Sequence, residues 1–133
     1  MIKGIGGIFI RANNPKLLAE WYANTFNLRF DTYEEGKTYG MEFVHQEGVN
    51  SAERKATIFS FNKSKEELPE KKKEFELNLQ VENLTTVLLH LEELEIPITG
   101  KEESEYGKFV WITDPEGNKL ELWQAPDATQ KED

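Results

Sequence analysis

Apolar and polar positions alternate near the start of the chain, as they do in a β-strand. Between residues 7 and 12, Ile8, Ile10 and Ala12 fall on one face, and Gly7, Phe9 and Arg11 fall on the other. A period of two residues predicts a strand. Because Phe9 is apolar as well, we expect both faces of the strand to pack against other groups. This pattern suits a strand that is covered by a helix on one face and lines a cavity with the other.

The next segment has the spacing of an amphipathic helix. Asn14 and Pro15 are typical of an N-cap and a first helical residue. Leu18, Trp21 and Tyr22 then follow at positions i, i+3 and i+4, which places them on one helix face. We therefore expect a helix over 15–25. Strands are predicted at 28–33, 39–45 and 55–61, with a turn at 35–36.

Residues 63–74 are dense in charges of both signs, which favours a solvated linker. Beyond them the pattern restarts with a strand at 77–81 and a helix that Asn83 caps and Pro97 ends. Further strands are predicted at 98–102, 109–113 and 119–123, with a hairpin turn at 114–118 in which Pro115 and Gly117 suit the backbone.

The two halves of the chain are similar in pattern. A shift of 69 residues overlays Ile8 on Leu77 and Asn14 on Asn83, and a Tyr-Gly pair recurs at Tyr39 and Tyr106. Each half is predicted as one strand, one helix and three strands. We expect a single α+β domain with modules at 5–62 and 75–124, the linker at 63–74 and a tail at 125–133, since units this small gain stability by packing together.

Composition and charge narrow the classes of partner. The 133 residues suit one domain, and the absence of cysteine excludes disulfides and thiolate ligands. Neither a secretory signal pattern nor a run of about 20 apolar residues is present, so we expect a cytoplasmic protein with no membrane partner. The net charge of −9 repels phosphate backbones, which argues against nucleic acid. It favours a neutral or cationic ligand, although it can serve solubility alone.

Two segments resemble a known superfamily. The helix and its Phe26-Asn27-Leu28 ending, and the turn Asp114–Asn118 followed by Leu120–Trp123, resemble the vicinal oxygen chelate (glyoxalase/bleomycin resistance protein/dioxygenase) superfamily. The resemblance covers about residues 5–124. It implies two tandem βαβββ modules that form a curled sheet around a cavity, and often a homodimer. It does not imply one reaction, because such folds carry many functions.

The resemblance also locates the superfamily's metal ligands. The first position falls on Gly7, the second-half counterpart falls on Glu76, where His is usual, and Glu121 matches the usual Glu. The fourth falls near residues 58–60, where none is a strong ligand. Catalytic zinc usually has three protein ligands. We therefore predict no metal centre and no cofactor. Glu76 and Glu121 could still hold Mg²⁺ or Mn²⁺ with waters, or act as a catalytic acid/base pair.

The aromatic residues indicate a ligand cavity, with ordinary core packing as the alternative. Stacking and cation–π contacts on such side chains suit a flat or cationic organic molecule. The predicted ligand-binding residues are Phe9, Phe59, Asn78, Phe109, Trp111 and Trp123. His45, at a strand end, and His90, off the apolar stripe of its helix, are weak candidates for chemistry.

The sequence therefore leaves three hypotheses. The first is a protein that binds a small organic molecule without the usual metal centre. The second is an enzyme, a lyase or isomerase that uses Glu121 and Glu76, with or without a divalent ion. The third is an interaction module whose cavity is filled by its own side chains. The sequence does not decide whether the protein is an enzyme or which molecule it binds.

Overall fold

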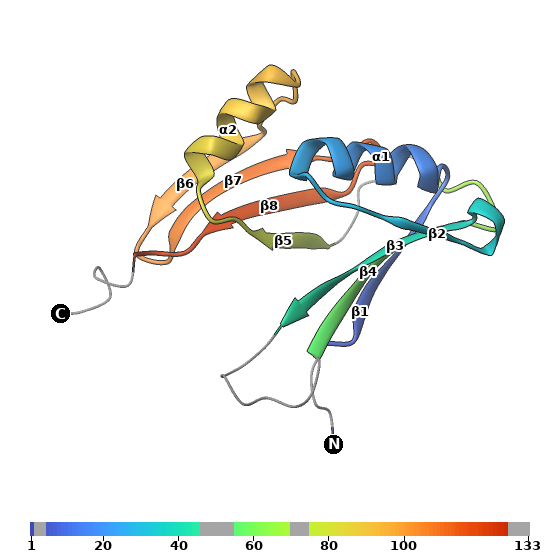
Figure 1. Ribbon diagram of the computed structural model, residues 1–133. Coiled ribbons are helices and arrows are strands. Elements are labelled where there is room, and N and C mark those ends of the chain that lie inside the picture. Colours follow the sequence, from blue (N-terminus) through green and yellow to red (C-terminus); the bar gives the residue numbers. More distant parts are fainter. Residues whose placement is uncertain (2–4, 46–54, 70–74, 128–133) are drawn as a thin grey trace. The chain divides into compact units, whose positions relative to one another are not determined.

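The chain divides into two compact units, residues 1–69 and residues 70–133. The structure is a computed structural model that describes residues 1, 5–45, 55–69 and 75–127 (Figure 1). Each unit contains one four-stranded mixed sheet and one α-helix, so the predicted α+β class and the two βαβββ modules are confirmed. The sheets are open rather than closed barrels. Parts of the predicted linker and tail, 70–74 and 128–133, lie outside the described residues, as does the segment 46–54.

The first unit has the strand order β1-β4-β3-β2. Strands β1 and β4 are parallel, and the other neighbouring pairs are antiparallel. Its elements are β1 (Gly7–Ala12), α1 (Pro15–Phe26), β2 (Asp31–Tyr33), the 3₁₀ turn η1 (Glu34–Gly36), β3 (Thr38–His45) and β4 (Lys55–Lys63). Strand β2 is shorter than predicted, because it pairs only with the first three residues of β3.

Helix α1 begins and ends as its sequence predicts. The side chain of Asn14 accepts a hydrogen bond from the Leu17 backbone N–H at 3.1 Å. Asn27 then ends the helix in the left-handed conformation, with φ of 56°. Leu18 and Tyr22 turn towards the sheet and are fully buried. The helix therefore covers one face of the first sheet and leaves the other face without a helix.

The second unit repeats this arrangement with the strand order β5-β8-β7-β6. Its elements are β5 (Glu76–Gln80), α2 (Leu84–Glu93), β6 (Gly100–Ser104), β7 (Gly107–Thr113) and β8 (Lys119–Gln124). Helix α2 lies on one side of this sheet (Figure 1). The first strands of the two units begin 69 residues apart, and so do their helices, which confirms the predicted internal repeat.

The core of the second unit lies between α2 and the sheet. Asn83 caps the helix through the Thr86 backbone N–H at 3.1 Å, and the left-handed Glu95, with φ of 58°, follows its end before Pro97. The buried core side chains come from every second strand position and from the helix: Leu77, Leu84, Leu91, Val110, Ile112, Leu120 and Leu122. The alternate strand positions therefore point to the other face.

The predicted hairpin turn between β7 and β8 is present and holds a buried polar group. Asp114 is 4% exposed, and its carboxylate accepts hydrogen bonds from the backbone N–H groups of Glu116 and Asn118 and from the Asn118 side-chain amide. Gly117 takes a φ of 85°. The turn fixes the register in which Trp111 lies opposite Glu121. Among the described residues, no helix is long and apolar enough to cross a membrane.

Candidate functional site

Five side chains gather on the face of the second sheet that α2 leaves open. Strand alternation directs them there, because their chain neighbours Leu77, Val110, Ile112, Leu120 and Leu122 point into the core. The register places Asn78 opposite Glu121, Glu121 opposite Trp111, and Trp123 opposite Phe109. We call this set, Asn78, Phe109, Trp111, Glu121 and Trp123, the aromatic–acidic face.

Glu121 lies in the middle of this face and is held from both sides. One carboxylate oxygen, Oε1, accepts a hydrogen bond from the Asn78 side-chain amide at 2.6 Å. The other, Oε2, accepts one from the Trp111 indole N–H at 3.1 Å. Each oxygen has about two acceptor positions. Each therefore keeps one position for another donor, and Glu121 is only partly buried.

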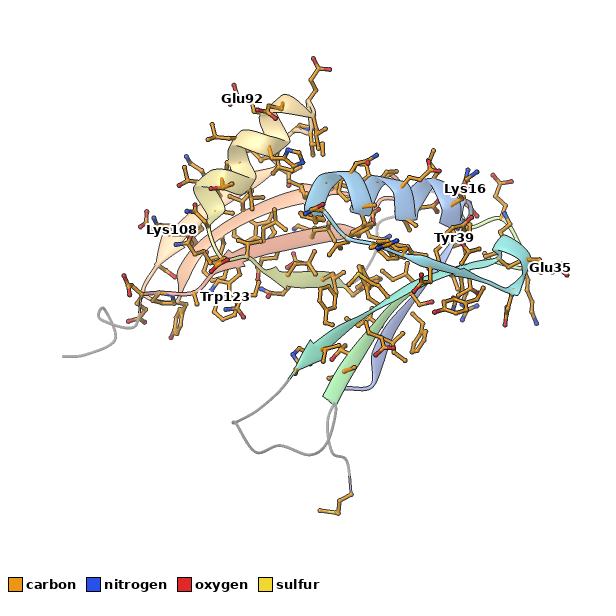
Figure 2. The ribbon with its side chains drawn as sticks, viewed as in Figure 1. Lys16, Glu35, Tyr39, Glu92, Lys108 and Trp123 are labelled. Carbon is orange, nitrogen blue, oxygen red and sulfur yellow. The ribbon has the colours of Figure 1, made fainter. Side chains whose placement is uncertain are left out.

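The three aromatic rings of the face are nearly parallel. The rings of Phe109 and Trp111 lie 6.1 Å apart with 15° between their planes, and those of Phe109 and Trp123 lie 6.5 Å apart with 14° between them. The Trp123 indole N–H donates to the Tyr106 backbone carbonyl at 2.8 Å, which holds this ring near the end of β8 (Figure 2). All three rings are partly exposed, so a ligand can reach them.

Gly107 makes room for this arrangement. Its φ is 125°, and a Cβ atom there would overlap the backbone oxygen of Gln124 and lie 2.8 Å from the Trp123 indole nitrogen. Only glycine therefore fits beside Trp123. Gly107 is not among the predicted site residues, although the recurring Tyr-Gly pair is a signal for it.

Glu76 shares the open face but has its own partner. It lies directly across from Lys119, and the two side chains form an ion pair of 3.0 Å while both remain substantially exposed. Glu121 is bound by Asn78 and Trp111 instead. The two carboxylates predicted as a catalytic pair therefore share a face but contact different partners. An exposed pair such as Glu76 with Lys119 contributes little to stability.

The predicted residues of the first unit separate onto two faces of its sheet. Phe9 is 61% exposed on the face without a helix. Phe59, in contrast, is 2% exposed and packs edge-on against Tyr22 of α1, with 5.4 Å between the ring centroids. Its side chain belongs to the core, because its strand position alternates with those of Ile58 and Ser60. Phe59 therefore cannot line an open site in this unit.

The open face of the first sheet carries a cavity of about 720 Å³. Phe9, Ile58 and Val44 supply exposed apolar surface to it. Its polar lining includes Arg29, Asp31, Tyr33, Thr38, Glu42 and Ser60. Apart from Ser60, considered only as a weak metal ligand, these polar residues are not among the predicted site residues. The alternation along β3 is a signal for Thr38 and Glu42 alone. The volume lies within the range of small-molecule sites.

The donors of neither unit fit a metal centre of the kind that the resemblance implies. A Cβ atom at Gly7 would lie 2.9 Å from the Ile58 carbonyl oxygen, so no ligating side chain has space there. Ile58 and Ser60, not Phe59, occupy the open face on the neighbouring strand. Of the two carboxylates in the implied ligand set, Glu76 is already paired with Lys119. In the described part of the chain, no three histidine, aspartate or glutamate side chains gather in a metal-binding group.

The histidines lie apart from these features. His45 Nε2 is 3.2 Å from the Thr57 hydroxyl at the end of β3. His90 Nδ1 is 3.9 Å from a carboxylate oxygen of Glu93 on α2. Neither belongs to the aromatic–acidic face.

No protein-family model and no curated protein matches the sequence. Solved structures do match. A glyoxalase/dioxygenase from Nostoc punctiforme is 17% identical, with a TM-score of 0.68 over 94% of this chain and 92% of that chain. A lactoylglutathione lyase from Agrobacterium tumefaciens is 14% identical, with a TM-score of 0.65 over 92% and 94%. A glyoxylase/bleomycin resistance protein/dioxygenase domain from Frankia sp. EAN1pec is 15% identical, with a TM-score of 0.62 over 95% and 100%.

The chain therefore has the fold of the glyoxalase/bleomycin resistance protein/dioxygenase proteins. This confirms, for the fold, the resemblance inferred from the helix ending and the last hairpin. Identities of this size establish the architecture and leave the function to be argued from the site.

Proposed function

We propose that this protein binds a small organic molecule through its aromatic–acidic face, without the metal centre that the fold often carries. The observation that carries the proposal is the position of Glu121. Its carboxylate is held by Asn78 and Trp111 beside three nearly parallel aromatic rings. Partly exposed rings around one oriented polar group are the usual composition of a small-molecule site.

The physical reasons for binding are stacking and desolvation. Aromatic side chains offer large apolar areas at a low cost in conformational entropy, and offset or edge contacts between rings are favourable. Trp123 and Glu121 are additionally held by hydrogen bonds to their neighbours. Ligand binding therefore costs little side-chain conformational entropy at these two residues. The cavity of the first unit supports the proposal as a second region of suitable size.

A fragment screen by protein-observed NMR tests this proposal. We expect fragments that bind to shift the indole N–H signals of Trp111 and Trp123 in a saturable way, and Trp123→Ala to abolish the shift of the Trp111 signal. Trp21, in the first unit, provides an internal reference because its ring packs against Tyr22 and Phe26. A screen in which no fragment moves the two signals of a folded protein would favour an interaction module instead.

An enzyme is the second candidate, and the similarity to a lactoylglutathione lyase favours it. In this case Glu121 would act as the acid or base. The test is to incubate the protein with lactoylglutathione, with and without divalent ions, and to follow its breakdown. Turnover that Glu121→Gln abolishes would establish an enzyme and replace the binding proposal.

We also propose that the protein is a homodimer, as the resemblance implies for many such chains, and that it is cytoplasmic. Sedimentation at several concentrations gives the mass directly, with a monomer of 15.4 kDa as the reference. A single monomeric species at every concentration would reject the dimer. Fractionation of cells that express the tagged chain tests the compartment.

A further inference from the structure

We propose that the ligand of the aromatic–acidic face is a planar organic cation with two neighbouring N–H groups, such as an amidinium or a guanidinium. This inference rests on the proposed function, because it names the chemical class of the molecule bound there. It follows from three properties of the face: its charge, the remaining acceptor positions on Glu121, and the alignment of the rings.

The aromatic–acidic face is negatively charged, and the lysine on the same side of the sheet is already paired. Lys119 is 3.0 Å from Glu76, so these two charges offset each other. Glu102 lies opposite Phe109 on β6 and adds a second acidic group beside the rings. Among the described residues of the second unit, no lysine or arginine pairs with Glu121; its two partners are the uncharged Asn78 and Trp111. A cationic ligand would supply the missing charge.

The hydrogen bonds of Glu121 select a ligand with two donors. Asn78 occupies one position on Oε1, and Trp111 occupies one position on Oε2. The two donors come from the strands on either side of β8, so they hold the carboxylate from its flanks. One acceptor position remains on each oxygen. Two parallel N–H groups of an amidinium or guanidinium match both oxygens of a carboxylate at once, and a single ammonium does not.

The rings select a flat molecule. Phe109 lies within 15° of parallel to both Trp111 and Trp123, so the three rings share one orientation across the face. A planar cation that binds the Glu121 oxygens can also contact the face of an indole, which is the best aromatic partner for a cation. Trp111 contributes twice, because its N–H holds Glu121 while its ring borders the same space.

Three probes of similar size separate these requirements. Benzamidine has the planar cation and two parallel N–H donors. Benzamide has a similar shape without the charge, and benzylamine has the charge without the two parallel donors. We would titrate each into the whole protein and follow the indole N–H signal of Trp111 by NMR, with Trp21 as the reference. Benzamidine should bind at least about tenfold more tightly than either of the others, since an oriented, charge-assisted pair contributes more than a neutral contact.

Variants locate the effect at Glu121. Glu121→Gln should weaken benzamidine at least about tenfold, because it removes the charge and one acceptor. Glu92→Gln is the matched control: it makes the same change of charge on α2, across the sheet from the aromatic–acidic face, and should leave binding unchanged (Figure 2).

Two outcomes would overturn the inference. Benzamide binding as tightly as benzamidine would show that charge does not select the ligand, and the proposed function would survive for neutral molecules. If benzamidine does not shift the Trp111 signal while other fragments do, the ligand is not a planar cation, and the proposed function again survives for other molecules. If no molecule of any class shifts Trp111 or Trp123, the proposed function itself fails.

Discussion

At the scale of single residues, the role of Trp111 is divided between its ring and its N–H group. The ring lies beside Phe109, and the N–H donates to Glu121 at 3.1 Å. Trp111→Phe keeps an aromatic ring and removes the donor. We expect a loss of about 1 kcal/mol in the free energy of unfolding, because Glu121 is partly exposed and water can replace the lost donor.

Urea denaturation measures this loss, and a titration with benzamidine followed at the Trp123 indole N–H measures its effect on the ligand. Trp21→Phe is the control that also removes one tryptophan, in the other unit. If Trp111→Phe destabilises the protein by no more than Trp21→Phe does, the hydrogen bond to Glu121 makes no measurable contribution to the free energy of unfolding.

Phe9 and Phe59 provide a second prediction at the residue scale, because they are predicted together and the structure separates them. Phe59 is 2% exposed among Tyr22, Phe61 and Phe30, whereas Phe9 is 61% exposed. Phe59→Ala should cost about 3–5 kcal/mol, as truncation of a buried phenylalanine usually does. Phe9→Ala should cost less than about 1 kcal/mol, since it removes little buried area. Thermal and urea unfolding of the two variants in parallel measure both losses in stability. Equal losses would contradict the assigned faces.

At the scale of elements, the pairing between the start of β7 and the end of β8 depends on a glycine. A Cβ atom at Gly107 would overlap the backbone of Gln124, whereas one at Gly117 would meet nothing within 4 Å. Both residues have positive φ, of 125° and 85°. Gly117→Ala should therefore cost about 1 kcal/mol for its conformation alone. Gly107→Ala should cost more, because β8 must also move.

The same pair of variants reports on the site. Gly107→Ala should displace the Trp123 ring and change the chemical shift of its indole N–H, while Gly117→Ala should leave that signal in place. Circular dichroism confirms that both variants fold, and urea midpoints rank their stability. Equal midpoints and an unmoved Trp123 signal would show that the strand end absorbs the extra atom without strain.

At the scale of the whole molecule, the described side chains provide no set of ligands suited to a metal ion. The described residues bring no three candidate ligands together, and Gly7 has no space for a side chain. We expect Mn²⁺, Ni²⁺, Zn²⁺ and Mg²⁺ to leave the thermal unfolding midpoint unchanged, because an ion raises it only when it binds the native state. EDTA is the control. A rise that is lost in Glu121→Ala but kept in Glu92→Ala would establish a metal site and favour the enzyme.

The sequence by itself determined the elements and their repeat. Helix caps at Asn14 and Asn83, the left-handed Asn27 and the turn at Gly117 are local features, and local backbone chemistry is sufficient to specify them. Strand periodicity also placed Phe109 with Trp111 on one strand face and Glu121 with Trp123 on another, because alternate residues of a strand always share a face.

Only the tertiary structure decided which of these residues meet. The register between strands placed Trp111 and Asn78 on either side of Glu121 and placed Glu76 opposite Lys119. Register depends on pairings between residues far apart in the chain. The choice of face also came from packing: Phe59 turned inward because α1 covers its side of the sheet. The lining of the cavity in the first unit comes from all four strands of its sheet and from the segment before β2, so no single segment of sequence could reveal it.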